Sequence, residues 1–234
     1  VSEGKKYPGF DRIKNMKKGG PIPRGWNLYA GVDIGSGGEK GHPAAISFIA
    51  VDPTYRQARV FRGWRGDEIE TASSDILNKY VELRGQLRMT AQFYDQSSKD
   101  FHTYATRMSE SFQTSEKSHE IGEDILNVLF KNDMLSIDDD EPELEKLAVE
   151  LSTLKKNTPK NKAKDDFTDS LRYACTKIPW DFTVIKGDLP EGYVVSKPDQ
   201  PEYVTRREEV LKSMALHEQA LSDEFEELNE QYGN

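Results

Sequence analysis

An aspartate interrupts an apolar, strand-like run near the start of the chain. The segment NLYAGVDIGSGG, Asn27 to Gly38, rises through strand-forming residues to Asp33 and then breaks into glycines. Burying a carboxylate in such a run is costly unless the group is paired, hydrogen-bonded or bound to a cation. No basic residue lies within the run. The fold must therefore bring the compensating group from elsewhere in the sequence.

The order of the predicted elements indicates an α/β fold with a mixed sheet. Three strands, a helix and a fourth strand follow one another over residues 26–34, 44–52, 57–64, 69–87 and 89–95. The fourth strand, MTAQFYD, also ends on a carboxylate, Asp95. In this order the first and fourth strands can lie side by side and parallel, which would bring Asp33 and Asp95 together.

Helical patterns follow at residues 98–108, 121–135, 142–154 and 165–178, and the last of them is acidic at its start. Asp166 and Asp169 are three residues apart and share a helix face, and Asp165 is a candidate N-cap. Together with Asp33 and Asp95 they predict an oxygen-rich site for Mg²⁺ or Mn²⁺, because hard cations prefer carboxylate and water ligands. Each part alone has an ordinary interpretation. Asp33 could start a turn, Asp95 could cap the next helix, and Asp166 and Asp169 could form a solvated first turn.

Charge is distributed unevenly along the chain. The net charge is −9, of which residues 202–234 carry −6. A lysine loop stands out against this background, with Lys155, Lys156, Lys160, Lys162 and Lys164. Overall acidity therefore does not exclude a local phosphate-binding surface, although a solvated linker explains the same lysines. The single cysteine, Cys175, excludes an internal disulfide and a cysteine-based zinc site. No apolar run is long enough to span a bilayer.

The segments YAGVDIGSGG, AQFYD, EKSHEIGEDILNVLFKNDML and KDDFTDSLRYA together resemble the nuclease domain of a tailed-phage large terminase. That family has a ribonuclease H-like fold, a mixed β-sheet flanked by helices. The resemblance implies that Asp33 and Asp95 are strand-borne metal ligands and that Asp166, Asp169 or both are the helix-borne ligands. Many relatives have Ala where this chain has Ser170.

The resemblance further implies a Mg²⁺- or Mn²⁺-dependent endonuclease that cuts concatemeric double-stranded viral DNA during packaging. Two ions would hold the phosphodiester, one activating a water and the other stabilising the leaving oxygen. The lysine loop would guide the DNA backbone. The implied partners are an N-terminal ATPase domain absent from this chain, the portal and the small terminase subunit, and the implied location is the host cell cytoplasm.

The expected organisation is a basic linker or arm at 1–26, the nuclease domain at 27–182, and a C-terminal extension at 183–234 with an acidic amphipathic helix. Other interpretations stay open. VDIGSGGEK also resembles the first phosphate loop of actin-like and sugar-kinase-like phosphotransferases, where Lys40 would assist. Another ribonuclease H-like nuclease, such as a junction resolvase, and a non-catalytic assembly module are further alternatives. His42 is either close to the scissile phosphate or simply exposed.

Overall fold

The computed structural model describes residues 4–35, 42–66, 72–95, 99–115, 119–158 and 163–185. Two compact units make up the chain, Val1–Ile178 and Pro179–Asn234. All of the helices and strands discussed below, except one short 3-10 helix, belong to the first unit. The acidic C-terminal helix expected from the sequence lies outside the described residues.

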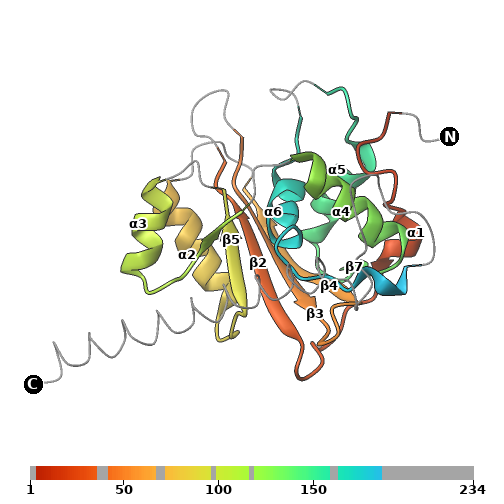
Figure 1. Ribbon diagram of the computed structural model, residues 1–234. Helices are drawn as coiled ribbons and strands as arrows, with labels where there is room; N and C mark the ends of the chain where they lie inside the picture. Colours follow the sequence, from red (N-terminus) through yellow and green to blue (C-terminus); the bar gives the residue numbers. More distant parts are fainter. Residues whose placement is uncertain are drawn as a thin grey trace, which may run out of the picture. The chain divides into compact units, whose positions relative to one another are not determined.

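The described part of the first unit is built on one mixed sheet of seven strands in the order β1-β7-β4-β3-β2-β5-β6 (Figure 1). The strands are β1 (Met16–Lys17), β2 (Asn27–Asp33), β3 (Ala45–Val51), β4 (Ala58–Arg65), β5 (Ala91–Tyr94), β6 (Gln113–Thr114) and β7 (Leu135–Asp138). Strands β2, β3 and β4 pair antiparallel, and β5 pairs parallel to β2. This parallel pair confirms the predicted neighbourhood of the first and fourth strands.

Helices cover both faces of the sheet. On one side lie α2 (Ser73–Arg84) and α3 (Lys99–Arg107), and on the other lie α4 (His119–Lys131), α5 (Leu144–Thr153) and α6 (Asp166–Cys175) (Figure 1). Side chains alternate between the two faces along a strand. Leu28, Ala30 and Val32 of β2 accordingly join the core that packs on α2 and α3. The intervening residues, Asp33 among them, therefore belong to the face that α6 covers.

Helix α6 lies unusually close to β2. A Cβ atom added to Gly31 would stand 1.9 Å from the backbone oxygen of Ser170, so glycine is needed there for the two backbones to meet. Ser170, the position that departs from the family pattern, has hydrogen-bond partners nearby. Its hydroxyl lies 2.6 Å from that of Ser47 on β3, and it donates to the carbonyl of Phe167. This close packing fixes the height of α6 above the end of β2.

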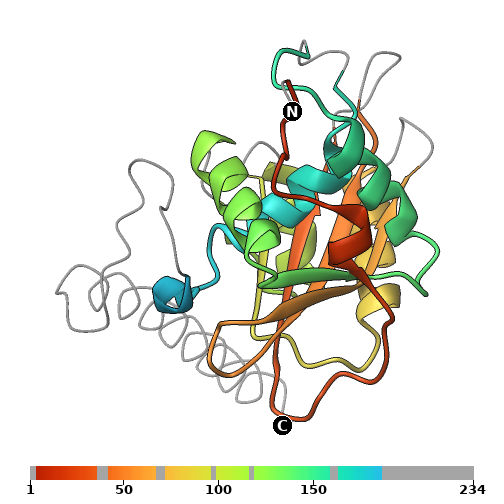
Figure 2. The same cartoon turned by 90° about the vertical axis from the view of Figure 1, so that its right-hand side faces the viewer.

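The N-terminal segment is folded against this helical layer. Tyr7 and Phe10 are buried, and α1 (Arg12–Asn15) leads into β1, which pairs parallel to β7. The backbone of Lys6 donates to Leu154 at the end of α5, and Gly9 donates to Asn127 of α4. Figure 2 shows the segment running between α4 and α5. Residues 4–18, which the sequence analysis assigned to a basic linker or arm, thus form part of the sheet and the helical layer.

The sequence analysis also missed strand β7. It extended one helix through residue 135 and began the next at residue 142, whereas α4 ends at Lys131 and Leu135–Asp138 forms a strand beside β4. Four residues of apolar and polar character are too few to be told apart from a helix end by periodicity. None of the described helices has the length and apolarity that crossing a bilayer requires.

Candidate metal centre

Asp33 stands at the end of β2, where the strand stops and the chain turns. Gly35 adopts a left-handed conformation, with φ of 69°, and its amide donates to Asp33 Oδ1 over 3.1 Å. Burial, with a further contribution from the charge of Asp169, raises the pKa of Asp33 well above its usual range. Within the described part of the chain, no basic side chain forms an ion pair with Asp33. Its ionised form therefore calls for a cation.

The parallel register places Asp95 beside Asp33. Val32 pairs with Tyr94, the last residue of β5. Strand β2 ends on Asp33, and Asp95 directly follows β5. The charge of Asp95 contributes to the raised pKa of Asp33. The two strand-borne carboxylates predicted from the sequence thus meet at one end of the sheet.

Helix α6 brings two further carboxylates to the same end. Asp166 and Asp169 lie in its first turn and are 3% and 8% exposed, and the charges of both raise the pKa of Asp33. Burial and the neighbouring Asp165 raise the pKa of Asp166 itself to about 6, while His42 acts in the opposite direction. The charges of three acidic groups therefore act on Asp33, and such an arrangement is unfavourable without positive charge.

Two buried polar contacts of α6 were not indicated by the sequence. Within the helix, Arg172 is fully buried, and its Nε donates to Asp169 over 3.1 Å. Between elements, Glu150 of α5 accepts hydrogen bonds from the backbone amide and hydroxyl of Thr168 and pairs with Arg65 of β4 over 2.6 Å. Burial raises the pKa of Glu150 to about 7. The Glu150 contacts couple the acidic helix to α5 and the sheet.

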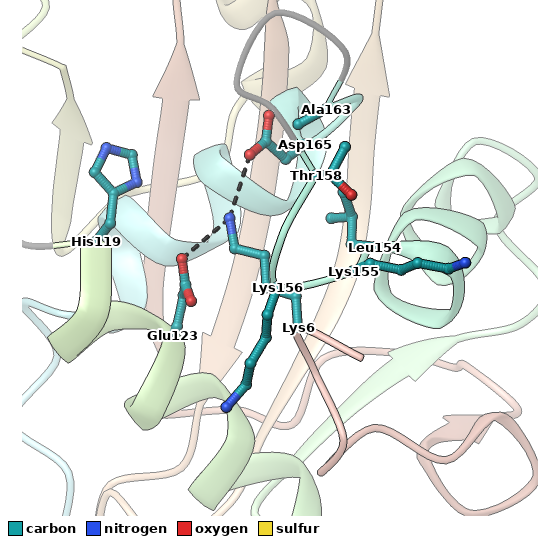
Figure 3. A pocket seen from close by; sticks show the side chains of 9 residues that line it. All are labelled: Lys6, His119, Glu123, Leu154, Lys155, Lys156, Thr158, Ala163 and Asp165. Atoms are coloured by element: carbon teal, nitrogen blue, oxygen red, sulfur yellow. Dashed lines mark hydrogen bonds and ion pairs between the residues drawn. The ribbon is translucent and has the colours of Figure 1, made fainter. Parts of the chain in front are cut away.

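Asp165 occupies the N-cap position of α6, as expected, but its side chain makes no capping hydrogen bond. It pairs instead with Lys6, whose Nζ lies 3.3 Å from Asp165 and 3.0 Å from Glu123 of α4. Figure 3 shows Lys6 between these two carboxylates at a pocket of about 200 Å³. No motif in the sequence links Lys6 to a residue 159 positions away, so only the fold reveals this contact.

His42 lies directly beside the acidic helix. Its Nδ1 is 3.2 Å from Asp166 Oδ1, and its side chain is 30% exposed. His42, Asp165 and Asp166 each offer a ligand atom, and these atoms lie within 4.8 Å of one another. Among the described residues this is the one group of three or more ligands that comes so close. Asp33, Asp95 and Asp169 influence one another electrostatically without meeting that limit.

The residues present suit a divalent cation. Asp166 Oδ2 is buried and has no hydrogen-bond partner among the residues that the structure describes, which leaves a carboxylate oxygen without compensation there. The carboxylate oxygens match the preferences of Mg²⁺ and Mn²⁺. A cation beside Asp33 and Asp166 would relieve both the repulsion among the acids and the unsatisfied oxygen.

Of the predicted lysine loop, Lys155, Lys156 and Lys164 are exposed, and Lys160 and Lys162 lie outside the described residues. Lys155 and Lys156 extend from the chain next to the pocket in Figure 3, and they point in different directions. Lys164 immediately precedes Asp165. Three exposed cations therefore lie near the start of the acidic helix, and Lys40 lies outside the described residues.

Solved structures with the same architecture are terminase proteins. A large terminase from a thermophilic bacteriophage, here called the thermophilic-phage large terminase, superposes with a TM-score of 0.59 at 14% identity, covering 77% of this chain and 46% of that one. The P22 large terminase nuclease domain gives 0.56 at 14% identity, over 73% and 90% of the two chains. The large terminase nuclease from phage G20c, with bound magnesium, gives 0.54 at 10% identity, over 75% and 98%.

The chain has the fold of a large-terminase nuclease domain. It spans less than half of the thermophilic-phage large terminase and nearly all of the P22 and G20c nuclease domains. This likeness confirms the ribonuclease H-like, helix-flanked sheet expected from the sequence. No family model matches the sequence, and no curated protein matches it. The nuclease-type fold is therefore visible in three dimensions where sequence comparison finds nothing.

Proposed function

We propose that this chain is the metal-dependent endonuclease domain of a viral genome-packaging terminase, which cleaves concatemeric double-stranded DNA. The observation that carries the proposal is the meeting of Asp33, Asp95, Asp166 and Asp169 at one end of the sheet, within a terminase-nuclease fold. A fold alone does not establish an activity. Asp33, a buried carboxylate beside three further acids, makes a purely structural role costly.

In this proposal the four aspartates hold Mg²⁺ or Mn²⁺ ions, with Asp33 and Asp166 as central ligands. Two such ions supply Lewis-acid chemistry, which lowers the pKa of an attacking water and neutralises charge on the departing 3′ oxygen. The chain itself supplies the positions. Gly35 orients Asp33 through its amide, Arg172 orients Asp169, and the contact between Gly31 and Ser170 sets the helix at a fixed distance from the strand.

The DNA is expected to bind across the exposed lysines that precede the acidic helix. Lys155, Lys156 and Lys164 would contact phosphates, together with Lys160 and Lys162. Such contacts position the duplex and carry little sequence information. The local lysine cluster offsets the chain's net charge of −9, which otherwise repels DNA.

An ATP-driven packaging machine is the expected context. The thermophilic-phage large terminase has also been determined in complex with ADP, and this chain covers only 44% of it. We therefore assign nucleotide binding to a separate ATPase domain, and we expect the portal and the small terminase subunit as further partners, in the cytoplasm of the host cell.

The test is cleavage of supercoiled plasmid by the purified chain in Mn²⁺, Mg²⁺ or EDTA. Wild-type protein should nick and linearise the plasmid with either metal and be inactive in EDTA. Asp33→Asn should abolish cleavage, because the variant keeps the size of the side chain and loses its charge. Asp75→Asn, an exposed acid in the first turn of α2, is the matched control and should cleave normally.

Parallel substrates separate this proposal from the other interpretations. A four-way junction cleaved in strong preference to duplex would indicate a resolvase. Nucleotide binding by a folded chain that cleaves no DNA would favour the phosphotransferase. Cleavage of duplex that is lost in Asp33→Asn and kept in Asp75→Asn supports the terminase nuclease.

A further inference from the structure

We propose that His42 is a direct ligand of the bound cation, together with Asp166, and that this imidazole gives the site a preference for Mn²⁺ over Mg²⁺. The inference rests on the proposed metal-dependent function and goes beyond it. It adds a ligand from the segment between β2 and β3 to a set otherwise made of carboxylates.

The first observation is the position of His42. The residue lies nine positions after Asp33 in the sequence, and its ring lies at the start of α6, with Nδ1 at 3.2 Å from Asp166 Oδ1. The side chain is 30% exposed, so the imidazole is accessible from solvent. A small shift of either group would place a cation between nitrogen and oxygen, at the distances of roughly 2.0–2.2 Å at which these donors hold metals.

The second observation is independent of His42. Asp166 is only 3% exposed, and its other oxygen, Oδ2, is buried without a hydrogen-bond partner in the described part of the chain. A buried carboxylate oxygen without a partner is expensive, and natural proteins rarely keep one unless a ligand, an ion or a water satisfies it. His42 contacts one oxygen of the Asp166 carboxylate, and the unsatisfied oxygen is the other one.

The third member of the group, Asp165, already has a cation. Lys6 Nζ lies 3.3 Å from Asp165 Oδ2 and anchors that side chain toward Glu123, as Figure 3 shows. Lys6 therefore partly neutralises Asp165 and holds it in place. A metal ion would therefore be compensated chiefly by Asp166, whose Oδ1 lies beside His42.

The alternative is a plain ion pair, in which a protonated His42 stabilises the Asp166 carboxylate. The two interpretations make opposite predictions for metal binding. As an ion-pair partner, His42 competes with the cation for Asp166, so its removal would leave Mn²⁺ affinity unchanged or improve it. As a ligand, His42 adds a donor atom, so its removal weakens binding.

The chemistry of the donor points to the metal. Imidazole nitrogen is a ligand of first-row transition ions, of which Mn²⁺ is the hardest, whereas Mg²⁺ prefers oxygen ligands in near-ideal octahedral geometry. Loss of His42 should accordingly weaken Mn²⁺ binding by at least about tenfold, the lower end of what removing even an outer partner of a metal site costs. Mg²⁺ binding should change much less, so the preference for Mn²⁺ should shrink.

Electron spin echo envelope modulation of Mn²⁺ bound to the purified chain tests the inference directly, because a coordinated imidazole produces a ¹⁴N modulation. The wild-type protein should show this modulation, and protein grown with ¹⁵N-histidine should lose it. His42→Ala should also lose it and bind Mn²⁺ at least about tenfold more weakly, with Mg²⁺ followed by competition. His102→Ala, a substitution of an exposed histidine on α3, is the matched control and should keep both properties.

The outcomes separate this inference from the proposed function. Mn²⁺ that binds in wild type and is lost in Asp33→Asn, but shows no ¹⁴N modulation, would overturn the His42 ligand and leave the nuclease proposal intact. The same holds for a modulation that persists in folded His42→Ala. Absence of any Asp33-dependent Mn²⁺ binding would overturn both. The isotope experiment needs no substitution and shows whether any of the four histidines coordinates Mn²⁺. Absence of a histidine signal there overturns the inference even where a variant folds poorly, and His42→Ala assigns a signal that is present.

Discussion

Replacing Gly31 by alanine tests whether the close approach of β2 and α6 controls the metal centre. The two elements carry the proposed ligands, Asp33 on the strand and Asp166 and Asp169 on the helix. A Cβ at position 31 would stand 1.9 Å from the backbone oxygen of Ser170, whereas ordinary contact begins near 3.4 Å. The clash involves backbone, so no side-chain rotation relieves it. The helix must retreat from the strand.

The size of the effect follows from these distances. The required retreat, the difference between 3.4 and 1.9 Å, is about 1.5 Å if the helix takes all of it. Overpacking of this kind costs typically about 1–3 kcal/mol, and we expect the upper end because the obstacle is rigid. For a domain of this size, about 3 kcal/mol lowers the Tm by roughly 6–12 °C. A ligand displaced by about 1 Å also costs on the order of a hundredfold in rate.

Thermal unfolding in EDTA, Mn²⁺ titration and plasmid cleavage measure the three consequences. Gly66→Ala is the control, because the nearest atoms to its Cβ are in the Trp64 ring at 3.2 Å and a side chain can move aside. We expect Gly31→Ala to melt well below Gly66→Ala and, at temperatures where it is folded, to bind Mn²⁺ weakly and cleave slowly. A Gly31→Ala protein with wild-type Tm and wild-type Mn²⁺ affinity would refute the reasoning.

Three further predictions concern groups around the site. Glu150→Gln should flatten the pH dependence of stability. The pKa of Glu150 in the folded state, about 7, exceeds the ordinary value of 4.5, so protonation of Glu150 favours the folded state. Its contribution to the unfolding free energy, about 3 kcal/mol, is present below pH 4.5 and is lost as the pH rises through 7. Urea unfolding at pH 5 and 7 measures it, and an unchanged difference between wild type and variant would contradict it. Arg172→Met should lower the unfolding free energy in EDTA by about 3 kcal/mol, because its aspartate partner is left buried and unpaired; equal urea midpoints would show that the pair contributes nothing. Replacing Lys155, Lys156 and Lys164 together by alanine should reduce the slope of log binding constant against log salt by about 0.9 for each phosphate that is no longer neutralised, and an unchanged slope in duplex binding would exclude them from the DNA surface.

The sheet could be predicted from the sequence where the pattern was local. The runs around Asp33, in β3 and before Asp95 are apolar and bounded by glycine, proline or polar residues, and each became a strand. Strand β7 is four residues long, and β1 is two, so their identity depends on partners far away in the chain. Strand β1 is a strand only because Met16 and Lys17 pair with Ile137 and Asp138 of β7.

For the candidate site, too, the sequence reveals the residues with a local signal and not those whose partners are distant. The carboxylates could be found because an acid at the end of an apolar strand is a local anomaly. Lys6 could not, since its partners Glu123 and Asp165 are more than a hundred residues distant and each belongs to an ordinary charged stretch. The same holds for Arg172, whose helical spacing from Asp169 was visible but whose burial was not.

The folded N-terminal segment gives Lys6 a significance that its sequence context hides. The backbone around Lys6 is fixed to the end of α5 by hydrogen bonds with Leu154 and Lys156, and its side chain reaches the first residue before the acidic helix. Burial opposes its charge, yet the hydrogen bond and charge of Glu123 and the charge of Asp165 keep its pKa raised. An ammonium group held this way places positive charge beside a cluster that would otherwise be almost wholly negative. The segment that the sequence pattern assigns to a linker therefore contributes to the electrostatic balance of the metal centre, and a displacement of that segment would be felt at Asp165 and, through it, at Asp166.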